Sequence, residues 1–355
     1  MGHMTRLDLG QDVVDLTATL VDIESVSGDE ATITDAIEAA LGQVAWLDLW
    51  RHRNSVVART SLGHADRVVI AGHVDTVPVN ANLPARLDNE FLHGLGSCDM
   101  KGGVAVGLKL AASLAAPTRD VTYVFYEAEE VEAERNGLTL ISAERPELLA
   151  ADFAVLMEPS NAVVEAGCQG TMRVDVSTRG VRAHSARSWN GVNAIHAARE
   201  ILGRLTAYQP RQPLIDGLRY HEGLNAVGIS GGVAGNVIPD ECTVAVNYRF
   251  APDRTVSEAA NHLREVFSGF DLVVSDFAPG ALPGLDRPAA AAFVEAVDGP
   301  VNPKFGWTDV SRFSALGVPA VNFGPGNPEL AHTQHERVPL AQLRSCLAQM
   351  TAWLT

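Results

Sequence analysis

V-V-I-A-G-H-V-D-T-V-P, residues 68–78, is the strongest structural signal in this chain. It begins with a short apolar run rich in β-branched residues, which is typical of a strand buried in a sheet. It ends in His73 and Asp75, and residues two apart on an extended segment point to the same side. A metal-bound imidazole whose second ring nitrogen is held by a carboxylate has this arrangement. Taken alone, however, one H-x-D is more often a strand end with two unrelated polar residues.

Two further apolar strands are followed by acidic residues in the same way. The predicted strand Val121–Tyr126 leads into Glu129 and Glu130, and the predicted strand Phe153–Met157 leads into Glu158. Strands that alternate with helical segments predict a mainly parallel α/β sheet, in which ligands bind at the carboxyl ends of the strands. Carboxylates gathered at one edge would repel each other, and a polyvalent cation is the simplest remedy.

Two more candidates lie outside these strand ends. Asp99, in G-L-G-S-C-D-M-K-G-G, comes just before a predicted apolar helix, where a carboxylate taken alone is more often a helix N-cap. His332 and His335 lie three residues apart in A-H-T-Q-H-E, as on a helix turn or a tight loop. The resulting candidate ligands are two imidazoles and three carboxylates: His73, Asp99, Glu130, Glu158 and His332.

This set of ligands suits Zn²⁺, or a neighbour such as Co²⁺ or Mn²⁺. Five ligands are too many for one tetrahedral zinc with an open position, but they fit two metals that share a bridging carboxylate. Of the adjacent Glu129 and Glu130, one can bind metal while the other faces a bound water. A metal lowers the pKa of that water toward about 7, and a nearby carboxylate can take its proton, which predicts a hydrolase acting on an amide. Glu132 and Glu134 are more simply a solvated acidic run.

Length, net charge and cysteine content argue against a nucleic-acid-binding, membrane or secreted protein. The 355 residues are enough for two domains, and a net charge of −16 argues against nucleic acid or an anionic membrane as a partner. No apolar run is long enough to span a bilayer, and the first residues lack a secretory signal. The four cysteines form no C-x-x-C, so we expect reduced thiols in a cytoplasmic protein. Residues 1–4 are typical of a tag remnant, so His3 is left out.

The pattern changes at about residue 171, where the predicted elements follow the order β-α-β-β-α-β of a ferredoxin-like unit. The stretch P-G-A-L-P-G, residues 279–284, is expected to be the hinge at which this insert ends. The predicted division is therefore 5–170 for the first part of a catalytic α/β domain, 171–284 for an inserted α+β domain and 285–355 for the second catalytic part.

The ordered motifs resemble the M20 family of metallopeptidases and deacylases over essentially the whole chain. H-V-D-T-V-P is similar to the family's first metal motif, C-D-M-K-G to its D-M-K-G and A-E-E to its D-E-E. The resemblance implies two zinc ions, with Asp99 as the bridging ligand. It implies that Asp75 orients His73 and that Glu129 is the general base. The other ligands that it implies are His73, Glu130, Glu158 and His332.

The resemblance extends to the insert, which is similar to the family's lid and dimerisation domain. G-V-R-A-H-S-A matches the motif whose histidine, here His184, reaches the active site of the partner subunit and helps to hold the substrate carbonyl. G-N-V-I-P-D contributes Asn236, and Y-R-F contributes Arg249, where the family has an arginine that grips a substrate carboxylate. A homodimer is therefore expected. Without the family match, His184 would be a surface histidine and Arg249 a strand-edge charge.

Within the family, A-G-C-Q-G-T and R-G-V-R-A-H-S-A-R-S-W resemble succinyl-diaminopimelate desuccinylases. This implies hydrolysis of N-succinyl-L,L-2,6-diaminopimelate to succinate and L,L-2,6-diaminopimelate, in lysine and diaminopimelate biosynthesis. Three residues depart from the family pattern: Ala128 replaces an acid, Leu95 replaces an arginine, and Gln169 stands where many members have a basic residue.

Two other classes of function remain open. One is another N-acyl amino acid deacylase, such as an acetylornithine deacetylase, or a carboxypeptidase. The other is a non-catalytic protein that binds metal or amino acids on the same scaffold. The presence of Glu129 argues against the second class, because binding needs ligands but no base.

Overall fold

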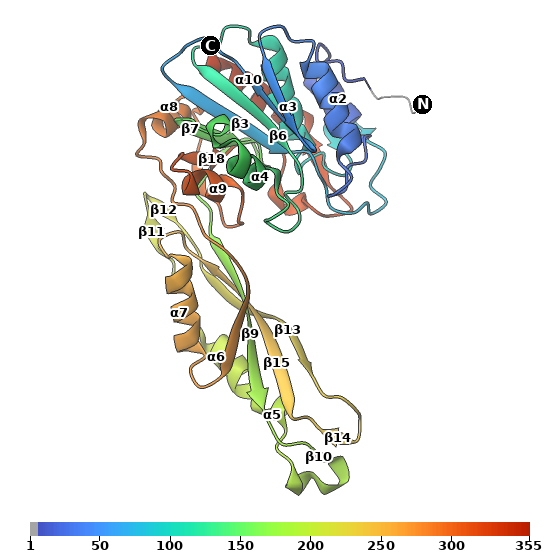
Figure 1. The fold of residues 1–355 in the computed structure, drawn as a ribbon, viewed down its shortest axis with the longest axis vertical. Coiled ribbons are helices and arrows are strands. Elements are labelled where there is room, and N and C mark those ends of the chain that lie inside the picture. Colours follow the sequence, from blue (N-terminus) through green and yellow to red (C-terminus); the bar gives the residue numbers. More distant parts are fainter. Residues whose placement is uncertain (1–5) are drawn as a thin grey trace. The chain divides into compact units, whose positions relative to one another are not determined.

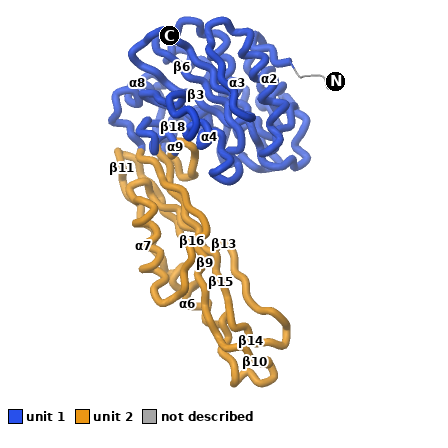
Figure 2. The backbone as a smooth tube through the Cα atoms, viewed as in Figure 1, with its two compact units in different colours: residues 1–166, 283–302, 312–355 blue, residues 167–282, 303–311 orange. Residues whose placement is uncertain are grey.

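The computed structural model describes residues 6–355, which form two compact units (Figure 2). Unit 1 comprises Met1–Ala166, Pro283–Asn302 and Arg312–Thr355, and unit 2 comprises Gly167–Leu282 and Pro303–Ser311. The expected tag remnant and the expected domain start at residue 5 lie outside the described residues. Among residues 6–355, no helix combines the length and hydrophobicity that a membrane span requires. The four cysteines are buried, and no disulfide joins them.

The boundaries of unit 2 lie within a few residues of the expected ones, but residues 303–311 differ. The sequence placed this segment in the second catalytic part, whereas it belongs to unit 2. The backbone N–H of Gln169 donates to the carbonyl of Lys304 at 3.2 Å, and Ser311 Oγ donates to the carbonyl of Pro279 at 2.7 Å. The segment therefore packs near both ends of the stretch Gly167–Leu282. These contacts join residues far apart in the sequence, so no local sequence pattern reveals them.

Unit 1 is built on an eight-stranded sheet of order β1-β2-β6-β3-β7-β18-β8-β17 (Figure 1). The strands are β1 (Asp48–His52), β2 (Ser55–Arg59), β3 (Arg67–His73), β6 (Asp120–Tyr126), β7 (Phe153–Leu156), β8 (Val164–Ala166), β17 (Val301–Pro303) and β18 (Ala320–Asn322). Strands β6, β3, β7 and β18 are parallel, whereas β2 and β8 pair antiparallel with their neighbours. This confirms the predicted mainly parallel α/β sheet.

Helices cover this sheet, which explains why β3 is apolar from residue 68 to residue 72. The helices are α1 (Val13–Val21), α2 (Ala31–Leu41), α3 (Lys101–Ser113), α4 (Gly137–Glu144), α8 (Pro288–Val297), α9 (Val310–Ala315) and α10 (Leu340–Leu354). Helix α3 packs on β3 and β6, with α10 beside it (Figure 1). Helix α1 also packs against α3. A small sheet is formed by β4 (Arg86–Leu87), β5 (Phe91–His93) and β19 (Arg337–Pro339).

Unit 2 has the predicted ferredoxin-like fold, with an antiparallel sheet of order β13-β15-β9-β16. Its strands are β9 (Gly170–Arg179), β13 (Gly223–Gly231), β15 (Glu241–Phe250) and β16 (Asp271–Ala278). Its helices are α5 (Ala194–Ala197), α6 (Arg199–Ala207) and α7 (Val256–Val266). Two short pairs were not predicted: β10 (Ala183–His184) with β14 (Val237–Ile238), and β11 (Leu214–Ile215) with β12 (Leu218–Arg219).

Candidate active site

Three neighbouring parallel strands carry candidate residues at their carboxyl ends. Strand β3 lies between β6 and β7, and His73 is its last residue. Glu129 and Glu130 follow β6, and Glu158 follows β7. Because parallel strands end at the same edge of a sheet, this order brings the side chains toward one place.

His73 is buried between two carboxylates. Its Nε2 lies 3.1 Å from Asp99 Oδ1, and its Nδ1 lies 3.4 Å from Asp75 Oδ1. The carbonyl oxygen of Asp75 is closer to Nδ1, at 3.0 Å. Burial alone would lower the pKa of His73, but the contacts with Asp75 and Asp99 outweigh it and raise the pKa well above its usual value.

The Asp75 carboxylate also holds the acidic turn after β6. Its Oδ1 accepts from the backbone N–H of Glu129 at 3.0 Å, and its Oδ2 accepts from the N–H of Glu130 at 3.2 Å. Ser27 Oγ donates to Oδ2 at 2.7 Å. Asp75 therefore fixes the backbone beneath both glutamates in addition to contacting His73. Of these contacts, the sequence predicted only the one with His73, and nothing in the sequence pointed to Ser27.

Asp99 lies between the two imidazoles. Its Oδ2 is 3.4 Å from His332 Nε2, and the same imidazole nitrogen is 2.8 Å from Glu130 Oε1. Contacts with Asp99 and then Glu130 raise the pKa of His332 to about 10. Burial would raise the pKa of Asp99, but the imidazoles of His332 and His73 outweigh it and hold the pKa well below its usual value. Positive charge on the two imidazoles therefore stabilises the ionised form of the Asp99 carboxylate.

Three overlapping groups bring their ligand atoms within 4.8 Å of one another in the described part of the chain. They are His73, Asp99 and Glu158; Asp99, Glu130 and His332; and His73, Glu129 and Glu130. The first two groups share Asp99. Imidazoles and carboxylates are ligands that divalent metal ions accept, so these groups could hold metal.

Glu336 supports Asp99 and was not identified from the sequence. Its Oε1 accepts from the backbone N–H groups of Cys98 and Asp99, each at 3.0 Å. Burial raises the pKa of Glu336 to about 7. The contact joins residues more than 230 positions apart and involves backbone amides. The one available signal was that Glu336 ends the motif A-H-T-Q-H-E.

The three candidate residues in unit 2 do not form one cluster: His184 and Asn236 lie at one end of the unit, and Arg249 lies at the other. His184 lies in β10, where its Nδ1 accepts from the N–H of Ala186 at 3.0 Å. Asn236 is close by, because its carbonyl accepts from the N–H of Ser185 at 2.9 Å. Arg249 lies at the other end of unit 2, near the end of β15 that pairs with the start of β9 (Figure 1). At about 3.4 Å per residue, β15 separates them by roughly 30 Å.

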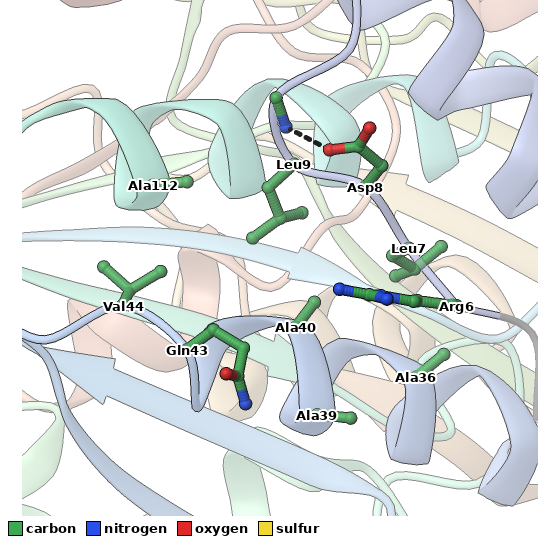
Figure 3. Close-up of a pocket in the computed structure, with 11 residues that line it drawn as sticks. Arg6, Leu7, Asp8, Leu9, Ala36, Ala39, Ala40, Gln43, Val44 and Ala112 are labelled. Atoms are coloured by element: carbon green, nitrogen blue, oxygen red, sulfur yellow. Dashed lines mark hydrogen bonds between the residues drawn. The ribbon is translucent and has the colours of Figure 1, made fainter.

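A surface hollow of about 1070 Å³ lies elsewhere in unit 1 (Figure 3). It is lined by residues 6–10, by α2 and by Ala112. Its one carboxylate, Asp8, accepts a hydrogen bond from the N–H of Gly10 at 2.9 Å. None of the candidate ligands lines this hollow.

The sequence matches peptidase family M20/M25/M40 over residues 69–355. It is 54% identical over 351 residues to a Mycobacterium tuberculosis protein named "Putative succinyl-diaminopimelate desuccinylase DapE", across 98% of this chain and 99% of the relative. It is 47% identical over 360 residues to a succinyl-diaminopimelate desuccinylase of Corynebacterium glutamicum, across 98% of each chain. The fold resembles a Staphylococcus aureus tripeptidase with a TM-score of 0.79 at 22% identity, across 98% of both chains. The chain therefore belongs to peptidase family M20/M25/M40.

Proposed function

We propose that this chain is a metal-dependent amide hydrolase that converts N-succinyl-L,L-2,6-diaminopimelate and water to succinate and L,L-2,6-diaminopimelate. The observation that carries the proposal is its near-full-length identity of 54% and 47% to relatives named for that reaction. The three overlapping groups of candidate ligands in unit 1 are the chemistry that such a hydrolase requires. The reaction belongs to lysine and diaminopimelate biosynthesis, and we assign the enzyme to the cytoplasm.

Two zinc ions per chain are part of this proposal, with Co²⁺ or Mn²⁺ as substitutes. His73, Asp99 and Glu158 would hold one ion, and Asp99, Glu130 and His332 the other. The contacts of Asp99 with both imidazoles, at 3.1 and 3.4 Å, support its role as the shared ligand. When bound, the ions would polarise the substrate carbonyl and lower the pKa of the attacking water.

Glu129 acts as the general base and then as the general acid. Its backbone is held by Asp75, and its carboxylate lies within 4.8 Å of ligand atoms of His73 and Glu130. The carboxylate takes a proton from the attacking water, whose oxygen bonds to the succinyl carbonyl carbon. Glu129 returns that proton to the amine nitrogen as the C–N bond breaks, so the base is regenerated in each turnover.

We assign unit 2 as the lid and dimerisation domain of a homodimer. Edge strand β13 exposes Val227 at 60% and Ile229 at 56%, and nearby Ile195 and Leu202 are each 39% exposed. An exposed apolar edge strand is a template for pairing with a second chain.

A dimer also accounts for the separation of the unit 2 candidates. One small substrate cannot contact both ends of β15, so His184 and Arg249 would serve different active sites. His184 of the partner subunit would donate to the developing oxyanion, with Asn236 beside it. Arg249 would bind a substrate carboxylate.

Parallel hydrolysis assays test the function. Zinc-loaded protein is given N-succinyl-L,L-diaminopimelate or N-acetylornithine, with a chelated sample as control. We expect fast cleavage of the succinyl substrate that the chelator abolishes. Cleavage of the acetyl substrate alone would reassign the chain to another deacylase of the family. Cleavage of neither would contradict the proposed reaction.

A further inference from the structure

Unit 2 carries a second arginine on the same face of its sheet as Arg249. In the pairing of β15 with β9, Arg249 lies opposite Thr171, and Asn247 lies opposite Arg173. Side chains alternate along a strand, and the intervening Met172 and Tyr248 are buried in the core against the helices. Arg173 and Arg249 therefore share the opposite, open face.

The two guanidinium groups are close, and neither is held in an ion pair by a residue that the structure describes. Diagonal neighbours on adjacent strands lie about 7–8 Å apart, within reach of long side chains. Desolvation and then the charge of Arg173 lower the pKa of Arg249, and the charge of Asp276 opposes them only in part. Within residues 6–355, neither guanidinium forms a hydrogen bond or an ion pair, although Asp276 lies opposite Arg173 on β16. By contrast, Arg179 of the same strand pairs with Glu241 at 2.8 Å.

The same face carries both acidic side chains and hydrogen-bond donors: Asp175 lies two residues from Arg173 on β9, and Asp276 lies opposite Arg173 on β16. Gln169 is 1% exposed, and its amide Nε2 has no hydrogen-bond partner in the described structure. Thr171 Oγ1 accepts from Asn247 Nδ2 at 3.2 Å, which leaves the hydroxyl proton of Thr171 free to donate. Thr171 and Arg173 alternate along β9 and share one face, whereas Gln169 is buried just before the strand begins. Two guanidinium groups that form no ion pair with the carboxylates of Asp175 and Asp276 remain able to bind an anion.

We propose that Arg173 and Arg249 together form a subsite that binds two carboxylates of the substrate, Arg173 holding the second. This inference rests on the proposed function, because N-succinyl-L,L-diaminopimelate carries three carboxylates. One is on the succinyl group, one is beside the scissile amide, and one is at the far end of the diaminopimelate part. A guanidinium matches a carboxylate with two parallel hydrogen bonds, which neither a lysine nor a glutamine can make.

Arg173→Met tests the subsite, because it removes the guanidinium and keeps an apolar stem. We expect the KM for N-succinyl-L,L-diaminopimelate to rise by about 10- to 100-fold, with little change in kcat, on losing charged hydrogen bonds. Arg173→Lys should restore part of the loss. The matched control is Arg179→Met on the same strand, where the KM should stay at the wild-type value. An unchanged KM in Arg173→Met would overturn the proposal.

Two substrate analogues identify the carboxylate. N-acetyl-L,L-diaminopimelate lacks the succinyl carboxylate, and N-succinyl-L-lysine lacks the carboxylate at the far end. The KM of one analogue should be the same for wild type and Arg173→Met, because the group that Arg173 holds is already missing. If Arg173→Met raised the KM of both analogues as much as that of the full substrate, Arg173 would hold the carboxylate beside the scissile amide, which both analogues retain.

Calorimetry measures ligand binding without turnover, so it can test the subsite even if the proposed reaction is wrong. Succinate and L,L-diaminopimelate are titrated into zinc-loaded wild type, Arg173→Met and Arg179→Met, so that no turnover is needed. If the wild type failed to hydrolyse the succinyl substrate, the proposed function would fail. Weaker binding of one ligand to Arg173→Met than to Arg179→Met would still support the subsite, and equal binding would overturn it.

Discussion

Units 1 and 2 arrange their candidate residues in different ways. In unit 1, residues from three strand ends and two loops meet at one edge of the sheet, and Asp99 lies 3.1 Å from His73 and 3.4 Å from His332. In unit 2, His184 and Arg249 lie at opposite ends of a sheet whose strand β15 is about 30 Å long. A parallel sheet gathers the ends of its strands, whereas a long antiparallel ribbon separates its two ends.

This difference in arrangement predicts that one chain is enough to bind metal but not enough to complete the substrate site. Unit 1 holds a full set of candidate ligands, so a single chain should bind metal. The candidates of unit 2 lie too far apart to serve one active site. We therefore expect unit 2 to contribute to catalysis only when a second chain is present. Changes in unit 1 should therefore abolish metal binding or the chemical step, while changes in unit 2 should affect assembly and substrate binding.

The largest effect is expected from Asp99→Asn, which alters the residue common to both ligand groups. A bound cation supplies several kcal/mol of transition-state stabilisation, and each 1.4 kcal/mol or so is tenfold in rate, so turnover should fall by at least about a thousandfold. Elemental analysis should find little metal at either position. Glu158→Gln changes one group only and should keep about one ion per chain. Equal metal content in the two variants would contradict the shared role of Asp99.

His184→Ala should cost about a hundredfold or more in kcat, as expected on losing an oxyanion donor, and leave the metal content unchanged. When it is mixed with Glu129→Gln, activity should return. The reason is that each mixed dimer has one site with a native Glu129 and a native His184 from the other chain. Rate assays on the mixture, with native mass spectrometry to count mixed dimers, check this. Mixed dimers without recovered activity would show that His184 does not act across subunits.

Val227→Asp should weaken the dimer, because it places a charge on edge strand β13. The expected result is a monomer with lower activity and unchanged metal content, measured by light scattering after size exclusion. Val273→Asp is the matched control, since Val273 is 64% exposed on the opposite edge strand β16. A dimer that survives Val227→Asp and dissociates with Val273→Asp would assign the interface to the other edge.

The smallest effect is a pH dependence of the metal-free protein. The folded state raises the pKa of His332 from 6.5 to about 10, chiefly through Asp99. The resulting stability is complete below pH 6.5 and is lost as the pH rises toward 10. The unfolding temperature of chelated protein should fall over this range, modestly because the His332 side chain is 51% exposed. An identical decline in His332→Gln would exclude His332 as its source.

The sequence was enough to predict that the candidate residues of unit 1 lie close together, because their position depends only on the order and direction of the strands. His73, Glu130 and Glu158 each follow an apolar run, and neighbouring parallel strands end at one edge whatever the details of packing. The ferredoxin-like order of unit 2 could be predicted in the same way, from alternating strand and helix patterns.

The supporting contacts could not be predicted, because they join distant residues through the backbone. Glu336 accepts from the amides of Cys98 and Asp99, and Asp75 accepts from those of Glu129 and Glu130. Any residue has a backbone N–H, so such contacts leave no pattern in the sequence. The segment 303–311 joins unit 2 for a similar reason.

Glu129→Gln, with metal content and turnover measured on the same sample, tests the proposed hydrolase most directly. Glu132→Gln is the control, because Glu132 belongs to the same acidic run and its side chain is 72% exposed. We predict wild-type metal content in both variants, full turnover in Glu132→Gln and a loss of about 10²- to 10⁴-fold in Glu129→Gln. Wild-type turnover by a metal-loaded Glu129→Gln protein would contradict the assignment of the base and the mechanism built on it.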